Sequence, residues 1–297
     1  MAAKGQNLTW TFVEDQPSIS FDGSTVTGSD RKKLLKTLHK AAKESHIEKL
    51  LSMRSQGKAM ECVAAHPASS QFISNGKFTR FADWRFVHAA RLNLLPVNGA
   101  KQWVDPSAKR CRCGAPNETL PHVVNHCKVH SAAWQKRHNA IQERIRKAIA
   151  FSGRIISVNR AVGETRLRPD IVASMEGKVF IVDITVPFEN RLAAFQEARR
   201  IKIKKYEPLI DHFKNQGASE VFIIPIVVGS LGAWHVGNDD FLRLIATKSY
   251  LALLRTLCCS DAIRWIRDIY IEHITGHRQF DNIEQGEVEG AIKGTHL

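Results

Sequence analysis

The stretch "RLRPDIVASMEGKVFIVDITVPFENR", residues 166–191, decides the fold of this chain. It holds two nearly continuous apolar runs, "IVAS" and "VFIVDITV", on either side of Glu176-Gly177. Gly177 supplies the positive φ that a tight hairpin turn needs, so the stretch predicts a β-hairpin over residues 168–186. Strands that are apolar along their whole length are typical of a sheet covered on both faces.

Each strand of the predicted hairpin carries one aspartate, Asp170 in the first and Asp183 in the second. The register set by the turn places them directly opposite each other, where Cβ atoms lie ~4.5–5.5 Å apart and like charges repel. Buried carboxylates without a partner are costly, so the pair favours a shared divalent cation such as Mg²⁺, with phosphate completing its ligands. Three alternatives stay open. Asp170 is a turn residue after Pro169, or Asp183 forms an ion pair with Arg168. In the third, the register is shifted by one residue, which puts the two aspartates on opposite faces of the sheet.

The segments around the hairpin alternate between helical and strand patterns. Helical spacing predicts helices over 29–57 (with Ser29 as cap and Gly57 as stop), 80–95, 131–153, 189–217 with a kink near Pro208, 238–255 and 259–273. Residues 221–229 predict a third strand, in which Pro225 indicates a sheet edge or a bulge. A leading helix followed by strand, strand, helix, strand and helix predicts an α/β domain with a mixed central sheet flanked by helices.

Four regions follow from these patterns. Residues 1–29 are polar and turn-rich, and we expect them to be poorly ordered. Residues 30–130 form a mostly helical linker, residues 131–275 form the α/β domain, and residues 276–297 form a frayed tail.

The composition points to a polyanionic partner. The 297 residues contain 43 Lys and Arg against 29 Asp and Glu, which gives a net charge of +14 and a pI near 9.7. Nucleic acid and an acidic membrane both fit such a charge, and we favour nucleic acid because the charge lies on periodic, foldable segments. The N-terminus lacks an apolar signal sequence, and the longest apolar run, 221–229, is too short to span a bilayer. We therefore expect a soluble, intracellular protein without a membrane partner.

A cysteine–histidine cluster occupies residues 111–127, "CRCGAPNETLPHVVNHC". Three thiolates and one imidazole are the ligand set of a structural, tetrahedral zinc site, and four protein ligands leave no open position for catalysis. The predicted zinc ligands are Cys111, Cys113, His122 and Cys127. His126 and His130 are alternative ligands, and the competing interpretation is a set of buried free cysteines beside a surface histidine.

The two aspartates also carry a resemblance to a known family. "RPD" followed by a second acid, Asp183, thirteen positions after Asp170 resembles the PD-(D/E)XK restriction-like nuclease core. That family usually has a lysine two residues after the second acid, where this chain has Thr185. The chain is similar to the endonuclease region of site-specific (R-two class) non-LTR retrotransposon polyproteins, in which the lysine is displaced onto the following helix. "RFVHAARLNLLP", "CRC…ETLPHVVNHC", "VDITVPFE" and "KIKKY" resemble their linker, knuckle, second-acid strand and lysine–tyrosine helix, together covering roughly residues 80–235.

The resemblance implies a restriction-endonuclease-like core, preceded by a helical linker with a zinc knuckle, that nicks target DNA for target-primed reverse transcription. It implies Asp170 and Asp183 as ligands of Mg²⁺ or Mn²⁺, and either Lys202 or Lys205 as the displaced catalytic lysine. Glu143 is a candidate third carboxylate. The candidates for nucleic-acid binding are Arg137, His138, Arg199, Arg200, Lys204 and Tyr206.

The sequence has no Y-x-D-D-type turn and no room for a reverse transcriptase domain. The resemblance thus implies the C-terminal part of such a polyprotein, nuclear in location. Its expected partners are target DNA, the element's RNA as a further possibility, and a reverse transcriptase supplied elsewhere. The rival hypotheses are a non-catalytic nucleic-acid-binding module with a degenerate nuclease fold, which Thr185 favours, and a protein-binding domain with structural aspartates.

Overall fold

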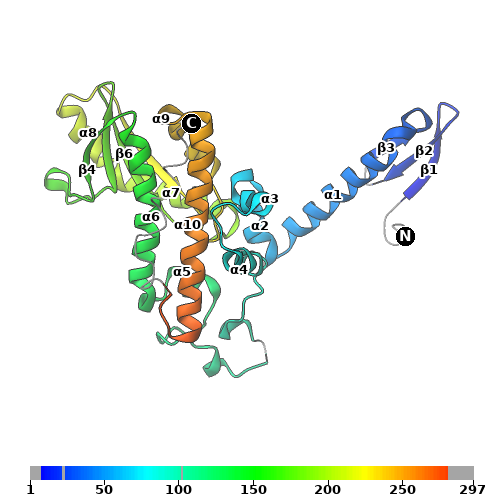
Figure 1. The fold of residues 1–297 in the computed structure, drawn as a ribbon, viewed down its shortest axis with the longest axis horizontal. Helices are drawn as coiled ribbons and strands as arrows, with labels where there is room; N and C mark the ends of the chain where they lie inside the picture. Colours follow the sequence, from blue (N-terminus) through cyan, green and yellow to red (C-terminus); the bar gives the residue numbers. More distant parts are fainter. Residues whose placement is uncertain (1–7, 22–23, 102, 280–297) are drawn as a thin grey trace, which may run out of the picture.

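The computed structural model describes residues 8–21, 24–101 and 103–279, which form a mixed α/β structure with two sheets (Figure 1). The N-terminal sheet is an antiparallel meander of β1 (Leu8–Val13), β2 (Gln16–Phe21) and β3 (Ser24–Thr27). The expectation of a poorly ordered segment over 1–29 is therefore wrong for these strands, where β-branched and aromatic residues alternate with polar ones. Residues 280–297, most of the predicted tail, lie outside the described residues.

Helix α1 (Leu34–Ser52) forms an arm that extends away from the rest of the molecule and carries β1–β3 at its far end (Figure 1). A 3₁₀ turn over Gly28–Lys33 leads into it, and Ala41 is its buried residue. Gly57 does not end this helix as predicted, because it lies at the start of α2 (Gln56–Ala64). A Cβ at Gly57 would lie 2.2 Å from the carbonyl oxygen of Leu51, so glycine here permits the close approach of α2 to the end of α1.

The linker continues through α3 (Gln71–Asn75), α4 (Phe81–Arg91) and the short α5 (Leu120–Asn125). Helix α4 begins where the sequence predicted a helix and ends four residues earlier than expected.

The second sheet is mixed, as predicted, with the strand order β4-β5-β6-β7. The elements that build it are α6 (Ser131–Ala150), β4 (Arg154–Val158), β5 (Ile171–Met175), β6 (Lys178–Thr185), α7 (Arg191–Tyr206), α8 (Pro208–Asn215) and β7 (Val221–Val227). Strands β4, β5 and β6 are antiparallel neighbours, and β7 runs parallel to β6. Pro225 lies in β7 at the sheet edge, which confirms that prediction, whereas β4 was not predicted.

The predicted hairpin is confirmed in its turn and its register. Glu176 and Gly177 both have positive φ, and Met175 pairs with Lys178. The strand pairing ends at Ile171, and the same register continued by one position brings Asp170 opposite Asp183, as expected.

Helices cover both faces of this sheet. Side chains of α6, α9 (Asp239–Ile245) and α10 (Lys248–Thr275) pack with Ile171, Phe180 and Val182 on one face. The end of α7 and α8 pack with Val172 and Ile181 on the other. The predicted kink near Pro208 is the break between α7 and α8, while the two helices expected over 238–255 and 259–273 are instead the short α9 and one long α10.

Helix α10 runs beside α6 and joins two parts of the core (Figure 1). Its first half packs in the cluster against the mixed sheet, through residues such as Leu251 and Leu254. Its second half, including Ile266 and Ile269, packs in a cluster with residues from α2, α4 and α5. Linker and sheet thus share one helix, and the division at residue 130 stays a prediction.

Candidate active site and metal centre

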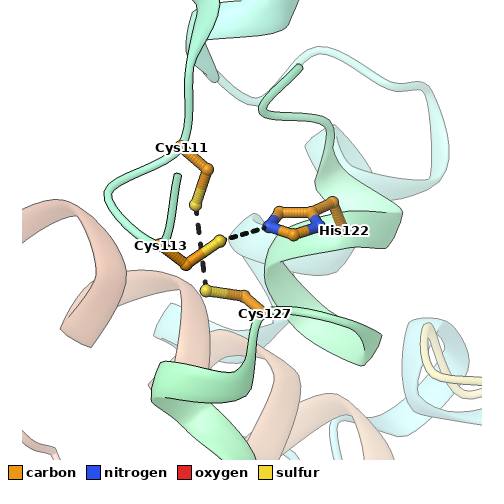
Figure 2. A group of neighbouring side chains, drawn as sticks. All are labelled: Cys111, Cys113, His122 and Cys127. Carbon is orange, nitrogen blue, oxygen red and sulfur yellow. Dashed lines mark hydrogen bonds between the residues drawn. The ribbon is translucent and has the colours of Figure 1, made fainter. Parts of the chain in front are cut away.

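The four predicted zinc ligands converge at one point (Figure 2). Cys111 and Cys113 lie on a turn closed by the backbone hydrogen bonds Gly114 N–H to Cys111 O (2.9 Å) and Cys111 N–H to Ala115 O (2.9 Å). Gly114 has a φ of 88°, which glycine adopts without strain. His122 lies on α5 and Cys127 directly follows that helix. The ligand atoms of all four side chains lie within 4.8 Å of one another.

The spacing of these atoms fits a tetrahedral metal. Zinc–sulfur bonds of ~2.3 Å at tetrahedral angles place two thiolates about 3.8 Å apart, and Cys111 Sγ and Cys127 Sγ are separated by 3.8 Å. Cys113 Sγ lies 3.2 Å from His122 Nε2. Burial raises the pKa of Cys111 and raises that of Cys127 to about 12, so a cation is needed to ionise both thiols at neutral pH. The cluster could therefore hold a metal ion such as zinc, and its residues are those expected from the sequence.

A second layer of buried polar side chains ties this cluster to α10. Glu118 Oε1 accepts a hydrogen bond from the backbone N–H of Asn98 (2.8 Å), and its Oε2 lies 2.9 Å from His273 Nε2. His273 Nδ1 lies 3.1 Å from His130 Nε2. The alternative ligand His130 contacts α10 and forms, with Cys127 and His273, a further group that could hold a metal ion, while His126 is exposed and outside these groups.

Asp183 is 2% exposed and lies on the face of β6 that packs against α7. Its Oδ1 forms an ion pair with Lys202 Nζ, and its Oδ2 accepts a hydrogen bond from the hydroxyl of Tyr206. Burial, and then the charge of Asp170, raise the pKa of Asp183, while Lys202 opposes the rise. The Asp183 carboxylate therefore lies near a second acid, Asp170, and Lys202 is the cation that pairs with it.

Asp170 lies beside the first residue of β5 and contacts α6. Its Oδ2 accepts a hydrogen bond from the backbone N–H of Ile184 (2.6 Å) and lies 2.9 Å from His138 Nε2. Burial of the imidazole disfavours its charged form, but the hydrogen bond and charge of Asp170 outweigh this and raise the pKa of His138. Gln142, one turn further along α6, donates from Nε2 to the backbone oxygen of Asp170 (3.0 Å).

The structure separates the roles of the two candidate lysines. Lys202 reaches Asp183, whereas Lys205 Nζ lies 4.6 Å from the ring centroid of Tyr206 and donates to its hydroxyl (2.9 Å). Lys202 also lines a pocket of ≈ 470 Å³ with His138, Asp170 and Thr185. A lysine thus occupies the space beside the second acid, although Thr185 stands at the usual lysine position.

Tyr206 is buried, and its hydroxyl, which donates its one proton to Asp183, also lies 3.0 Å from the backbone oxygen of Arg168. Burial, and then Asp183, raise its pKa far above the usual range, so the hydroxyl stays protonated and serves as a donor. The side chain of Tyr206 thus packs inside the protein and is bonded to Asp183, and its contact with nucleic acid stays a prediction.

The remaining candidates divide between structural and exposed positions. Arg137 is buried and donates to Val124 O (3.3 Å) and Asn125 Oδ1 (3.0 Å). Arg199 is half-buried and donates to Pro225 O (2.8 Å).

Arg200 is exposed and forms an ion pair with Glu197 (2.6 Å), and Lys204 is exposed. Glu143 is paired with Arg146 and Lys147, so its carboxylate is engaged away from the aspartates.

Two features of the site were not predicted: the shared face of α6 that brings His138, expected only as a nucleic-acid-binding residue, to Asp170, and the buried Glu189. Trp134, His138 and Gln142 follow one another at four-residue spacing, a signal for one face of α6, and Trp134 and His138 both line the 470 Å³ pocket. Glu189 is fully buried in the loop between β6 and α7, where it accepts hydrogen bonds from the N–H groups of Leu231 (2.8 Å) and Ala233 (3.1 Å). No local pattern marks Glu189, because its partners lie more than forty residues away.

Comparison with known proteins adds one match. Residues 15–94 match a family model described as the T26G10.4 domain, which covers about a quarter of the 297 residues and ends before the metal centre and the mixed sheet. No curated protein matches the chain.

Over the described residues, no helix combines the length and the apolar character that crossing a bilayer requires.

Proposed function

We propose that the chain is a metal-dependent DNA endonuclease, the nicking module of a site-specific non-LTR retrotransposon polyprotein. The observation that carries the proposal is the convergence of Asp170, Asp183 and Lys202 where the inner strand β5 begins and its neighbour β6 ends. The order α6-β4-β5-β6-α7-β7, with β7 parallel to β6, also agrees with a restriction-endonuclease-like core. The cysteine–histidine cluster before it supports the knuckle-then-nuclease order of that family.

The two carboxylates fit a divalent cation by their chemistry. Burial and the charge of Asp170 raise the pKa of Asp183 despite Lys202, so a further cation at the site would favour the ionised pair of carboxylates. Carboxylates together with substrate phosphate are the ligands that Mg²⁺ prefers. Among the described residues, the groups of three or more metal-ligating side chains do not include Asp170 and Asp183, so phosphate and water would complete the coordination. When bound there, Mg²⁺ or Mn²⁺ would polarise the scissile phosphate and lower the pKa of a bound water.

The chain's own residues hold and assist this site. Tyr206 and the backbone N–H of Ile184 each donate to one of the carboxylates and thereby fix its orientation. His138 holds Asp170 from the α6 side. Lys202 would stabilise the charge that develops on phosphate, an effect worth ~10²–10³ in rate for a single well-placed donor. Zinc in the cluster of Cys111, Cys113, His122 and Cys127 would fix the knuckle against α10.

Supercoiled plasmid nicking in Mg²⁺ tests the proposal. We expect the wild type to convert supercoiled to open-circular DNA, and Asp183→Asn to lose this activity while it binds the plasmid as before. The exposed Asp211→Asn on α8 is the matched control and should nick like the wild type. A wild type that binds DNA without nicking it under any divalent cation would refute the enzyme and favour the non-catalytic nucleic-acid-binding module.

A further inference from the structure

A second pocket lies on the other side of the connection between β6 and α7. Its volume is ≈ 750 Å³, and it opens between α2, the end of α4, the start of α5 and residues 187–194. Val186 lines the pocket beside Asp170, and the next residue, Pro187, lines this second pocket. The two pockets are therefore lined by consecutive residues of the chain, and a ligand in the second pocket would lie next to the proposed nuclease site.

The walls of this pocket are fixed by tertiary contacts. Arg191 Nη1 forms an ion pair with Glu61 Oε2 of α2 (2.7 Å), and the backbone N–H of Leu192 donates to the other oxygen of Glu61 (3.1 Å). On the loop side, the N–H of Ser230 donates to Pro187 O (2.9 Å), and Glu189 accepts from Leu231. A pocket held in this way exists before its ligand arrives, as ligand sites usually do.

The lining combines positive charge with an apolar floor. Arg54 and Lys58 are exposed at the pocket, and buried Arg91 adds a third positive charge. Glu189 is the one carboxylate of the lining, and its oxygens accept hydrogen bonds from Leu231 and Ala233.

The rest of the lining is apolar or polar. The apolar part comes from Ala59, Ala90, Pro121, Phe188 and Ala194. Asn190 brings an exposed side-chain amide, a group that can pair with the edge of a base, whereas the amide of Asn125 is bonded to Val186, Arg137 and Ser230.

These properties select a nucleotide over other anions. Phosphate alone would not use the apolar floor, and a double helix is too wide for a pocket in the ~300–1,000 Å³ range of small-molecule sites. An unpaired base can enter such a pocket and stack on an aromatic side chain such as Phe188, while its phosphate stays with the lysine and arginine outside. Single-stranded and extruded nucleotides are bound in this way by proteins that act on nucleic acid.

We propose that this pocket binds one unpaired nucleotide of the DNA strand next to the proposed cleavage site. That the nucleotide belongs to a DNA strand rests on the proposed function. That the ligand is a nucleotide rests on the lining of the pocket alone. The protein would then prefer DNA with a displaced or bulged base over a continuous duplex, and the β6–α7 connection would set the distance between that base and the bond that is cut.

The test compares the affinity of the full chain for two labelled duplexes, one fully paired and one with a single-nucleotide bulge, by fluorescence anisotropy in buffer without Mg²⁺. We expect the wild type to bind the bulged duplex about tenfold more tightly, the order of magnitude that base stacking supplies. Ala194→Trp fills the pocket and should reduce this ratio to one. Ala193→Trp, on the exposed neighbouring position of α7, is the matched control and should keep the ratio.

A second variant, which changes a charge, is needed because a misfolded Ala194→Trp protein would also lose the preference for the bulged duplex. Lys58→Glu changes an exposed side chain of the lining and should lower the bulge preference. Lys43→Glu, the same change on the exposed face of α1, should weaken both duplexes equally and leave the ratio unchanged. A wild-type ratio of one, or an unchanged ratio in both pocket variants, overturns the proposal.

Two further readouts separate the sources and the two proposals. If free deoxyadenosine monophosphate displaces the bulged duplex at the same concentration as unlabelled bulged duplex does, the assignment to a strand is overturned. If the wild type nicks plasmid but binds the bulged and the paired duplex equally well, the nucleotide-binding proposal is rejected and the endonuclease proposal stands. If the wild type prefers the bulged duplex but does not nick plasmid, the endonuclease proposal is rejected and the nucleotide-binding proposal stands.

Discussion

Glu189→Gln should change how the stability of this protein depends on pH. Burial raises the pKa of Glu189 from the ordinary value of 4.5 to about 7 in the folded state, and Arg91 and the N–H groups of Leu231 and Ala233 oppose the rise only in part. The folded protein therefore holds a proton on this carboxyl between about pH 4.5 and pH 7 that the unfolded chain releases. Because the folded state binds more protons in this window, the contribution of Glu189 to the free energy of unfolding falls as the pH rises through it.

The magnitude follows from the two pKa values. Each pH unit of difference corresponds to about 1.4 kcal/mol, so ionisation of Glu189 costs the folded state roughly 3 kcal/mol once the pH exceeds 7. Glutamine cannot ionise, and its side-chain oxygen can accept the bonds from Leu231 and Ala233 that Glu189 Oε1 accepts at 2.8 and 3.1 Å. The free energy of unfolding of the variant, minus that of the wild type, should therefore increase by roughly 3 kcal/mol between pH 4.5 and pH 7.5.

Urea unfolding followed by tryptophan fluorescence, at pH intervals from 4.5 to 8, measures this difference. Loss of metal at low pH affects both proteins and cancels in the comparison. Glu207→Gln, at an exposed position between α7 and α8, is the control and should follow the wild-type profile. A difference between Glu189→Gln and the wild type that stays constant within about 0.5 kcal/mol over this range, well below the expected change, would show that Glu189 titrates alike in both states and refute the reasoning.

Three further predictions concern the two candidate sites. Purified wild type should contain about one equivalent of zinc by elemental analysis. Cys111→Ser should lose this zinc, whereas Cys62→Ser, which changes a buried cysteine outside the cluster, should retain it. A full equivalent of zinc in the Cys111 variant would contradict the proposed metal centre. Lys202→Met should lower the plasmid nicking rate ~10²-fold or more, whereas Lys205→Met removes the same charge and should change it only a few-fold, so equal losses would reject the assignment of Lys202. Tyr206→Phe removes a buried donor to a charged acceptor and should reduce the free energy of unfolding by about 2 kcal/mol, measured by urea unfolding at pH 7; an unchanged midpoint would mean that the hydrogen bond to Asp183 adds no net stability.

The parts of the structure that could be predicted are those specified by neighbouring residues. The hairpin follows from Gly177 at a tight turn between two apolar runs, and its register follows from that turn. The cysteine–histidine cluster could be predicted because its four residues lie within seventeen residues of sequence. In both cases the local chemistry allows few alternatives.

The parts that could not be predicted depend on residues distant in sequence. Lys202 and Lys205 lie on one helix and have the same chemistry, and only the packing of α7 on the sheet decides that Lys202 reaches Asp183. The contact of His138 with Asp170 likewise depends on how α6 crosses the sheet. Strand β4 is short and half-exposed, so its own sequence carries little apolar periodicity.

The shared helix α10 has a consequence for the order of events during synthesis. Domains generally fold as they leave the ribosome, beginning at the N-terminus. Here both the sheet core, through Leu254 and Ala262, and the linker core, through Ile266 and Ile269, use side chains of this helix. Neither core can close until residues 248–275 have emerged, so the basic linker and the open sheet remain exposed together on the nascent chain. Apolar surface exposed in this way favours aggregation until α10 arrives.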